Sequence, residues 1–222
     1  MSINEGVLQT VTFEDLENRA RTLAGSRTRS ILGIVGAPGA GKSTLAERLV
    51  ASLGPDTAVL VSMDGFHYAN RVLEHLGRRS RKGAIDTFDD GGYSSLMERL
   101  HTQTEDSEPC IYTPEFRRDL EEPIGSAIPV RYDVPLIVTE GNYLLQPTGH
   151  WPRARAVMDD IWYLAPAEAV RHQRLIRRHE HFGKTPEEAL EWALGTDEAN
   201  ARLIAESARY ADVVVRLNWV SA

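Results

Sequence analysis

Residues 36–43 read GAPGAGKS and match the spacing G-x-x-x-x-G-K-[ST] in full. The apolar run 31–35 comes directly before them, and a helical pattern over 42–53 follows. Glycines at these spacings let backbone N–H groups turn inward around an anion, and the N-terminus of the next helix adds its positive end. A strand, a glycine-rich turn and a helix in this order predict a binding loop for a nucleoside triphosphate.

The motif also assigns individual residues to the nucleotide and its metal. Lys42 is expected to reach the β- and γ-phosphates, and Ser43 is expected to hold Mg²⁺. ATP and Mg²⁺ are therefore the cofactors that we expect. The residues expected to contact the nucleotide are Gly36, Ala37, Pro38, Gly39, Ala40, Gly41, Lys42, Ser43 and Thr44.

Further apolar runs alternate with helical patterns along the chain. Strands are expected at 31–35, 58–63, 135–140, 160–164 and 212–217. Helices are expected at 12–25, 42–53, 94–103, 167–179, 186–192 and 196–210. This alternation predicts a parallel sheet covered by helices on both faces. We expect an α/β fold, a three-layer α/β/α P-loop domain with five strands that spans 1–222, with 1–28 as an N-terminal helical extension.

Composition limits the partners of the chain. The 222 residues include 25 basic and 32 acidic ones, for a net charge of −7. An acidic balance disfavours binding to a polyanion, so nucleic acid is not expected as a partner. Cys110 is the single cysteine, which excludes an intrachain disulfide and fits a reducing, cytoplasmic setting. No window approaches the roughly 20 apolar residues that cross a bilayer, so no membrane is expected either.

Two carboxylates follow predicted strands. Asp64 comes just after the strand at 58–63, and Glu140 ends the strand at 135–140. Ligands gather at the carboxyl ends of parallel strands, so both carboxylates are expected to face Lys42. Asp64 is the candidate general base for an acceptor hydroxyl, and Glu140 is the candidate carboxylate for Mg²⁺. As alternatives, Asp64 could cap a helix or close an Asx turn, and Glu140 could be a solvated acid.

Several classes of P-loop protein have to be separated. A GTPase switch would usually carry a guanine-reading Asn-Lys-x-Asp segment, and no Asn-Lys pair occurs in this chain. A motor or helicase would normally be longer or more basic. The carboxylates Asp64 and Glu140 favour a small-molecule kinase. A nucleotide-binding regulatory protein, or an ATPase switch that acts on a protein partner, stays open as the alternative.

Five segments together resemble one group of kinases. They are GAPGAGKST (36–44), MDGFHYAN (63–70), KGAIDTFD (82–89), EGNYLL (140–145) and RLIRRHEHFGKTPEEA (174–189). In this order they resemble the P-loop kinases grouped with uridine kinase, phosphoribulokinase and bacterial type I pantothenate kinase, over residues 30 to 218. The chain is most similar to the nucleoside/nucleotide-kinase-like branch, some members of which are labelled fructose transport system kinases. The resemblance implies the strand order 2-3-1-4-5, a small helical lid at about 174–188, and a homodimer as an option.

The resemblance also implies roles for site residues. In these kinases the aspartate of the DGF segment is the base, which corresponds to Asp64, and the glutamate that opens EG belongs to the metal and phosphate site, which corresponds to Glu140. The aromatic and histidine side chains after Asp64 are candidate walls of the acceptor pocket, and the segment 82–89 lines it. The expected acceptor-binding residues are Phe66, His67, Tyr68, Lys82, Asp86, Phe88 and Arg118.

A basic helix and lid clamp the phosphates in related kinases. Here the segment RHQRLIRRH supplies Arg171, Arg174, Arg177 and Arg178. Arg174 and Arg178 are the first candidates for catalytic residues, since the planar fork of arginine can hold two phosphate oxygens. A solvated basic face is the alternative for each of them. Gly183 would let the lid bend.

One stretch departs from the pattern of the group. Related sequences carry a Tyr-Asp-Arg-like triplet, whereas TPEFRRDLEEP has Phe116 and Arg117 in place of Tyr and Asp, and Arg118 keeps the basic position. If the missing aspartate holds an acceptor hydroxyl, this chain prefers a different acceptor, such as an anionic one. The expected reaction is transfer of the γ-phosphoryl group of Mg·ATP to a hydroxyl of a small metabolite, with a sugar, a nucleoside and a pantothenate-like compound all open.

Overall fold

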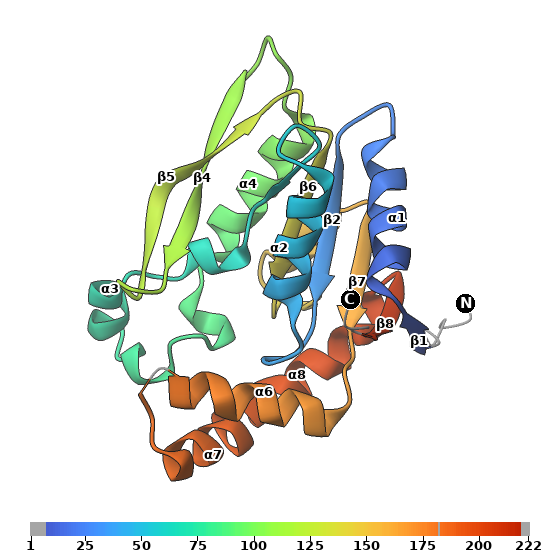
Figure 1. Ribbon diagram of the computed structural model, residues 1–222. Coiled ribbons are helices and arrows are strands. Elements are labelled where there is room, and N and C mark those ends of the chain that lie inside the picture. Colours follow the sequence, from blue (N-terminus) through green and yellow to red (C-terminus); the bar gives the residue numbers. More distant parts are fainter. Residues whose placement is uncertain (1–7, 182, 219–222) are drawn as a thin grey trace.

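The computed structural model describes residues 8–181 and 183–218. At its centre lies a parallel sheet of six strands in the order β1-β8-β7-β2-β6-β3 (Figure 1). The strands are β1 (Leu8–Val11), β2 (Ser30–Val35), β3 (Ala58–Leu60), β6 (Leu136–Gly141), β7 (Asp160–Leu164) and β8 (Val213–Leu217). The five strands expected from the sequence run β3-β6-β2-β7-β8, which corresponds to the order 2-3-1-4-5.

The expectation of five strands was wrong by one, because β1 pairs in parallel with β8 at the edge of the sheet. Residues 1–28 were expected to form a helical extension, yet they also contribute this strand. Three of the four residues of β1 are exposed, so the strand carries no buried apolar pattern. Residues 1–7 of the extension lie outside the described part of the chain.

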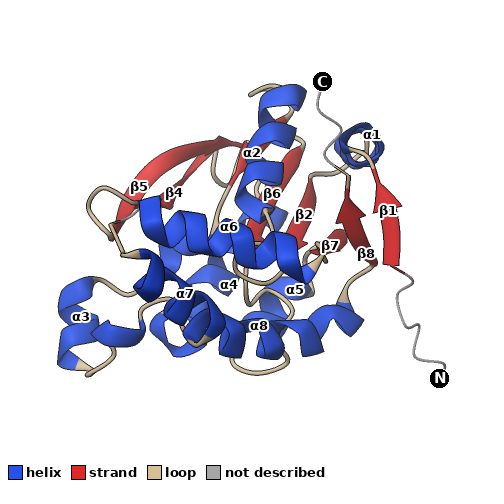
Figure 2. Cartoon of the chain, turned by 60° about the horizontal axis from the view of Figure 1, so that its bottom comes forward, coloured by secondary structure: helices blue, strands red, loops and turns tan. Residues whose placement is uncertain are grey.

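Helices cover both faces of the sheet, which confirms the three-layer α/β/α fold. Figure 2 shows α1 (Phe13–Ala24) and α2 (Lys42–Leu53) on one face, and α5 (Trp151–Arg155) and α8 (Thr196–Glu206) on the other, together with α4 (Asp90–Thr102). Side chains alternate across each strand. In β2, Leu32 and Ile34 pack toward α1 and α2, whereas Ile31 and Val35 pack toward α4, α5 and α8. All six residues of β2 are therefore buried.

The helix α1 docks on the sheet through its polar side as well as its apolar one. Thr12 and Asp15 form a capping box, in which each side chain accepts the backbone N–H of the other residue. Arg19 donates two hydrogen bonds to the carboxylate of Asp160 at the start of β7, at 2.5 and 2.8 Å. The indole N–H of Trp162 donates to the same carboxylate at 2.9 Å. Asp160 thus joins α1 to the amino edge of the sheet.

Two segments between the strands of the sheet, 63–87 and 110–131, form separate structures beside it. The first contains η1 (Met63–Phe66), α3 (Asn70–His75), η2 (Arg79–Arg81) and η3 (Ile85–Thr87). The second is an antiparallel hairpin of β4 (Cys110–Arg117) and β5 (Glu122–Arg131), which rises beside α4 in Figure 1. Neither the hairpin nor the short helices were expected from the sequence.

The remaining helices are α6 (Glu168–His181), α7 (Pro186–Leu194) and η4 (Ser207–Tyr210). Figure 1 shows α6 and α7 beneath the end of β2, across the carboxyl edge of the sheet. They overlap the region expected to form a lid. Of the helices in the described part of the chain, none is both long enough and apolar enough to span a membrane.

Candidate active site

The loop between β2 and α2 has a conformation that can bind an anion, and it packs against α6. Gly41, with φ of +96°, precedes α2, and no side chain in the described structure caps the first N–H groups of this helix. These donors and the helix dipole are therefore available to a phosphate. Gly39 has φ of +80°, and a Cβ there would lie 2.8 Å from the carbonyl oxygen of Arg171. The Arg174 guanidinium donates to the carbonyl oxygen of Ala40 at 3.1 Å, which joins α6 to the loop.

Lys42 lies buried at the start of α2. Its Nζ donates to Asn142 Oδ1 at 2.7 Å and to the carbonyl oxygen of Ala37 at 3.3 Å. Burial lowers the pKa of Lys42, and the carboxylate of Glu140 opposes this effect. These contacts hold the ammonium group beside Asn142, just after the end of β6. The β- and γ-phosphates of a bound nucleotide are expected at this place.

Glu140 is a buried carboxylate near the end of β6. Its Oε1 accepts a hydrogen bond from Ser62 Oγ at 2.8 Å. Burial raises the pKa of Glu140 and the nearby Asp64 carboxylate raises it further, whereas Lys42 and the hydroxyls of Ser62 and Ser43 favour its charged form. Two carboxylates and a hydroxyl in one place are the hard oxygen donors that Mg²⁺ prefers, so this donor set fits the expected metal.

Asp64 does not belong to a strand or to a helix cap. The strand β3 ends at Leu60, three residues before the expected end, and Asp64 lies in the 3₁₀ turn η1. Ser62 caps this turn, and its Oγ accepts the N–H of Asp64 at 3.2 Å. The Asp64 side chain is 26% exposed, and its Oδ2 accepts a hydrogen bond from Arg118 at 3.1 Å. The carboxylate is therefore accessible, close to Glu140 and Lys42, and paired with an arginine.

The hairpin delivers Arg118 to this place. It packs against η1, where Gly65 lies so close that a Cβ would be 2.7 Å from the carbonyl oxygen of Pro114. The register of β4 shifts at this point, between Thr113 and Glu115. Such a bulge bends a strand and redirects the side chains beyond it. The glycine of the DGF segment is thus explained by close packing of the hairpin beside the expected base.

His67 lies beside Asp64 and packs between two aromatic rings. Its ring lies 4.0 Å from the ring of Phe88 and 4.8 Å from that of Phe116, between centroids. Its Nδ1 lies 2.8 Å from the carbonyl oxygen of Asp64. Burial lowers the pKa of His67, so the neutral imidazole is favoured at neutral pH. Phe88 is buried and continues into the aromatic core beyond His67.

Three residues expected to bind the acceptor have other partners in the structure. Phe66 packs edge-on against the ring of Tyr93, at 5.4 Å between centroids. The carboxylate of Asp86 accepts a hydrogen bond from Arg81 at 2.6 Å, within its own loop. The phenol of Tyr68 lies near the carboxylates of Asp89 and Asp90. These contacts shape the loops around the site, and they do not place Phe66, Asp86 or Tyr68 against the carboxylate of Asp64.

The arginines of α6 separate into different roles. Arg174 contacts the phosphate-binding loop, and the positive charge of Arg178 reaches Lys42, whose pKa it lowers. Arg177 is exposed. Arg171 is buried and donates to the carboxylates of Glu168 and Glu198, so it joins α6 to α8. Arg171 is therefore held inside the protein rather than offered to phosphates.

Sequence reasoning missed two polar residues that organise the site. Ser62 bonds both Glu140 and the backbone of Asp64, and Asn142 bonds Lys42. Each lies two residues from a predicted carboxylate, in the segments VSMD and EGNY. A polar side chain so close to the end of a buried strand was the available signal.

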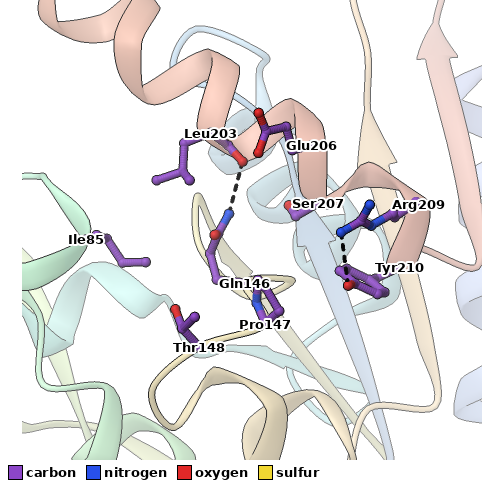
Figure 3. A pocket seen from close by; sticks show the side chains of 9 residues that line it. All are labelled: Ile85, Gln146, Pro147, Thr148, Leu203, Glu206, Ser207, Arg209 and Tyr210. Carbon is purple, nitrogen blue, oxygen red and sulfur yellow. Dashed lines mark hydrogen bonds between the residues drawn. The ribbon is translucent and has the colours of Figure 1, made fainter.

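A cavity of about 250 Å³ lies elsewhere, between the loop after β6 and the end of α8 (Figure 3). Figure 3 shows the Gln146 amide pointing to Leu203, with Arg209 beside the phenol of Tyr210. Its lining contains neither the phosphate-binding loop nor Asp64 or Glu140. The lining residues are Ile85, Gln146, Pro147, Thr148, Leu203, Glu206, Ser207, Arg209 and Tyr210.

Comparison with known proteins places these features in a family. Residues 31–220 match the model of the phosphoribulokinase/uridine kinase family. A candidate uridine kinase of Schizosaccharomyces pombe is 31% identical over 92% of this chain and 90% of its own length. A pantothenate kinase of Parvibaculum lavamentivorans is 33% identical over 53% of this chain and 36% of its own.

A solved structure agrees with this assignment. The crystal structure of a candidate fructose transport system kinase from Silicibacter sp. TM1040 has a TM-score of 0.78 and is 32% identical, covering 95% of this chain and all of that one. Family model, relatives and structural neighbour all point to kinases. The chain therefore belongs to the phosphoribulokinase/uridine kinase family and is an ATP-dependent phosphotransferase with a hydroxyl group as acceptor.

Proposed function

We propose that the chain transfers the γ-phosphoryl group of Mg·ATP to a hydroxyl of a small metabolite, with Asp64 as the general base. One observation carries this proposal: Lys42, Glu140 and Asp64 converge at the carboxyl ends of β2, β6 and β3, close enough for their charges to act on one another. A phosphate-binding cation, a metal-binding carboxylate and an accessible carboxylate are the three groups that phosphoryl transfer to an alcohol requires.

The nucleotide would lie along residues 36–44, with its phosphates on the N–H groups at the start of α2. Lys42 would bind the β- and γ-phosphates, held in place by Asn142. Ser43 and Glu140 would hold Mg²⁺, which when bound supplies positive charge to the phosphate oxygens. The buried Glu140 carboxylate is then balanced by a cation, which its position requires.

In the transfer step, the acceptor oxygen bonds to the γ-phosphorus, and the bond from that phosphorus to the oxygen bridging it to the β-phosphate breaks. The proton of the acceptor hydroxyl passes to Asp64, and ADP leaves. His67 and Phe116 would form one wall of the acceptor pocket, since the His67 ring lies beside Asp64 and the Phe116 ring packs against the His67 ring. Catalysis of this kind depends mainly on positioning and electrostatics.

The proposed lid comprises residues 174–188 within a single kinase domain spanning 1–222. Arg174 and Arg178 would bind phosphate oxygens when the lid closes and would exclude water from the transferring group. Gly183, with φ of +93°, lies between α6 and α7 and would absorb the bend. Residue 182 lies outside the described part of the chain.

The acceptor class is tested by ADP release from Mg·ATP with sugars, nucleosides and pantothenate, which the names of the relatives suggest. Wild type is compared with Asp64→Asn and with Asp56→Asn, whose exposed carboxylate precedes the same strand β3. We expect one acceptor to stimulate ADP release, and Asp64→Asn to lower kcat by on the order of 10²–10⁴-fold. Asp56→Asn should leave kcat unchanged.

A different pattern would contradict the kinase proposal. If no acceptor stimulates ADP release and Asp64→Asn matches wild type, the carboxylate is not a base. A rise in ATP hydrolysis that needs a protein partner instead would favour the ATPase switch.

A further inference from the structure

Arg118 forms an ion pair with Asp64, the carboxylate that is proposed to accept the proton of the acceptor hydroxyl. Its guanidinium donates to Asp64 Oδ2 at 3.1 Å, from the turn that joins β4 to β5. The Arg118 side chain is 54% exposed, so solvent and ligands can reach it. A general base must offer an unengaged oxygen to the acceptor hydroxyl, and Arg118 engages Oδ2 of the carboxylate. Any group that draws Arg118 away from Asp64 would therefore free Oδ2 for the acceptor.

A second cation, Lys82, lies near the same aromatic ring as Arg118. The Nζ of Lys82 is 5.0 Å from the centroid of the Phe116 ring, and the Cζ of Arg118 is 5.8 Å from the same centroid. Lys82 donates to Asn70 Oδ1 and to the carbonyl oxygen of Glu121, both of which are neutral acceptors. Its direct hydrogen-bond partners are therefore neutral, and the carboxylates of Glu122 and Glu121 act on its charge only from a distance.

The hairpin turn is held in place independently of Arg118. Both carboxylate oxygens of Glu122 accept the N–H of Asn70, at 3.0 Å. Glu121 has φ of +53°, a backbone conformation uncommon for residues other than glycine, and its carbonyl oxygen reaches Lys82. Because these contacts fix the turn, the Arg118 side chain can exchange partners while the hairpin stays in place.

Resting on the proposed kinase function, we propose that the acceptor carries an anionic group, a carboxylate or a phosphate monoester, that binds Arg118 and Lys82 and replaces Asp64 as the partner of Arg118. The planar guanidinium suits both kinds of anion. An anionic acceptor would be bound and would free Asp64 in the same step. Water or a neutral alcohol would leave Arg118 on Asp64, so the ion pair suppresses wasteful hydrolysis of ATP.

Pairs of acceptors, one with an anionic group and one without it, test this inference. The pairs are glycerol with D-glycerate and with glycerol 3-phosphate, fructose with fructose 6-phosphate, and pantothenyl alcohol with pantothenate. Product is identified by ³¹P NMR beside ADP release. In at least one pair we expect the anion to have a kcat/KM at least about tenfold above that of its neutral partner, as for sites built to bind a substrate's polar group. The glycerate and glycerol 3-phosphate arms separate carboxylate from phosphate recognition.

Three variants then locate the effect. Arg118→Gln should raise KM for the preferred anion, abolish the preference over its neutral partner and raise ATP hydrolysis without acceptor, because Asp64 is freed. Arg118→Lys should restore part of the preference. Arg117→Gln is the matched control, since its neighbouring guanidinium binds Asp119 at 2.8 and 2.9 Å.

Each contrary result has its own meaning. Equal or better turnover of the neutral members, with product formed, overturns the anionic acceptor and leaves the kinase function standing. An increase in KM for ATP rather than for the acceptor in Arg118→Gln would make Arg118 a nucleotide contact and would also overturn the inference. Absence of product from every compound, charged or neutral, counts against the proposed function itself.

Discussion

The Glu140 carboxylate lies buried between Ser62, Lys42 and Asp64, and each neighbour acts on its charge. Burial and Asp64 disfavour the charged form more than Lys42 and the hydroxyls favour it, so the pKa is raised. The metal site proposed here would require a charged Glu140 carboxylate, yet its surroundings disfavour that charge. At the scale of the residue, function and stability are opposed.

Replacing Glu140 by glutamine should reveal this opposition. A carboxyl group whose folded pKa is raised stabilises the fold below its unfolded pKa, near 4.5, and loses that contribution as pH rises through the folded value. At pH 7 without nucleotide, Glu140→Gln should therefore melt a few degrees higher than wild type, at about 2–4 °C per kcal/mol for a chain of this size. The difference should shrink as pH falls toward 4.5, and turnover with Mg·ATP should be lost.

Thermal melting across pH measures this effect. Glu47→Gln, an exposed substitution on α2, serves as the control and should melt like wild type. A Glu140→Gln protein that melts at or below wild type at pH 7 would show that the buried charge is not destabilising.

At the scale of the element, α6 matters because it touches the phosphate-binding loop. A Cβ on Gly39 would lie 2.8 Å from Leu175 Cγ as well as from the carbonyl oxygen of Arg171. Arg171 in turn joins α6 to α8 through Glu198. The position of the loop therefore depends on the packing of two helices that follow it by more than a hundred residues.

Gly39→Ala should weaken nucleotide binding, and Gly77→Ala should not. Both glycines have positive φ, +80° and +65°, but nothing lies within 4 Å of a Cβ on Gly77. Each change should cost about 1–2 kcal/mol of backbone strain. Only Gly39→Ala displaces the loop from α6, so only it should weaken Mg·ATP binding, by roughly tenfold or more. Calorimetric titration and chemical unfolding measure the two effects, and equal ATP affinities in the two variants would contradict the close-packing argument.

At the scale of the whole molecule, the carboxyl ends and the amino ends of the strands have separate roles. The carboxyl edge carries the site, while the amino edge carries Asp160, which joins α1 to β7 through Arg19 and Trp162. Parallel strands place these two edges at opposite ends of the same layer. Stability at one edge can therefore change without disturbing chemistry at the other.

Asp160→Asn should lower the free energy of unfolding and leave kinetics intact. The amide would present a donor where the carboxylate accepts three hydrogen bonds, so we expect a loss of about 1–3 kcal/mol. Urea unfolding and steady-state kinetics test both parts. Asp133→Asn is the control, because its half-exposed ion pair with Arg131 should contribute at most about 1 kcal/mol. A fall in kcat in Asp160→Asn would show that the edges are coupled.

Local sequence patterns were sufficient to predict the phosphate-binding loop and most of the strands and helices of the three layers. The phosphate-binding loop is specified within eight consecutive residues, 36–43, and apolar runs located every strand of the sheet except β1. The edge strand β1 escaped prediction, because it is short, mostly exposed and paired with residues more than two hundred positions later. The order of the other five strands came from the resemblance to a family rather than from the runs themselves.

By itself, the amino-acid sequence determined the phosphate-binding loop, the alternation of strands and helices, and the two carboxylates at strand ends, because these features depend on neighbours or on short periods. Only the tertiary structure decided which side chains meet them. Asn142 reaches Lys42 across 100 positions, and Arg118 reaches Asp64 across 54. Such contacts arise from the packing of a bulged hairpin and a strand end, which no periodicity in the chain encodes. The sequence therefore named candidate residues such as Arg118, whereas their contacts with Asp64 and with one another could be read only from the structure.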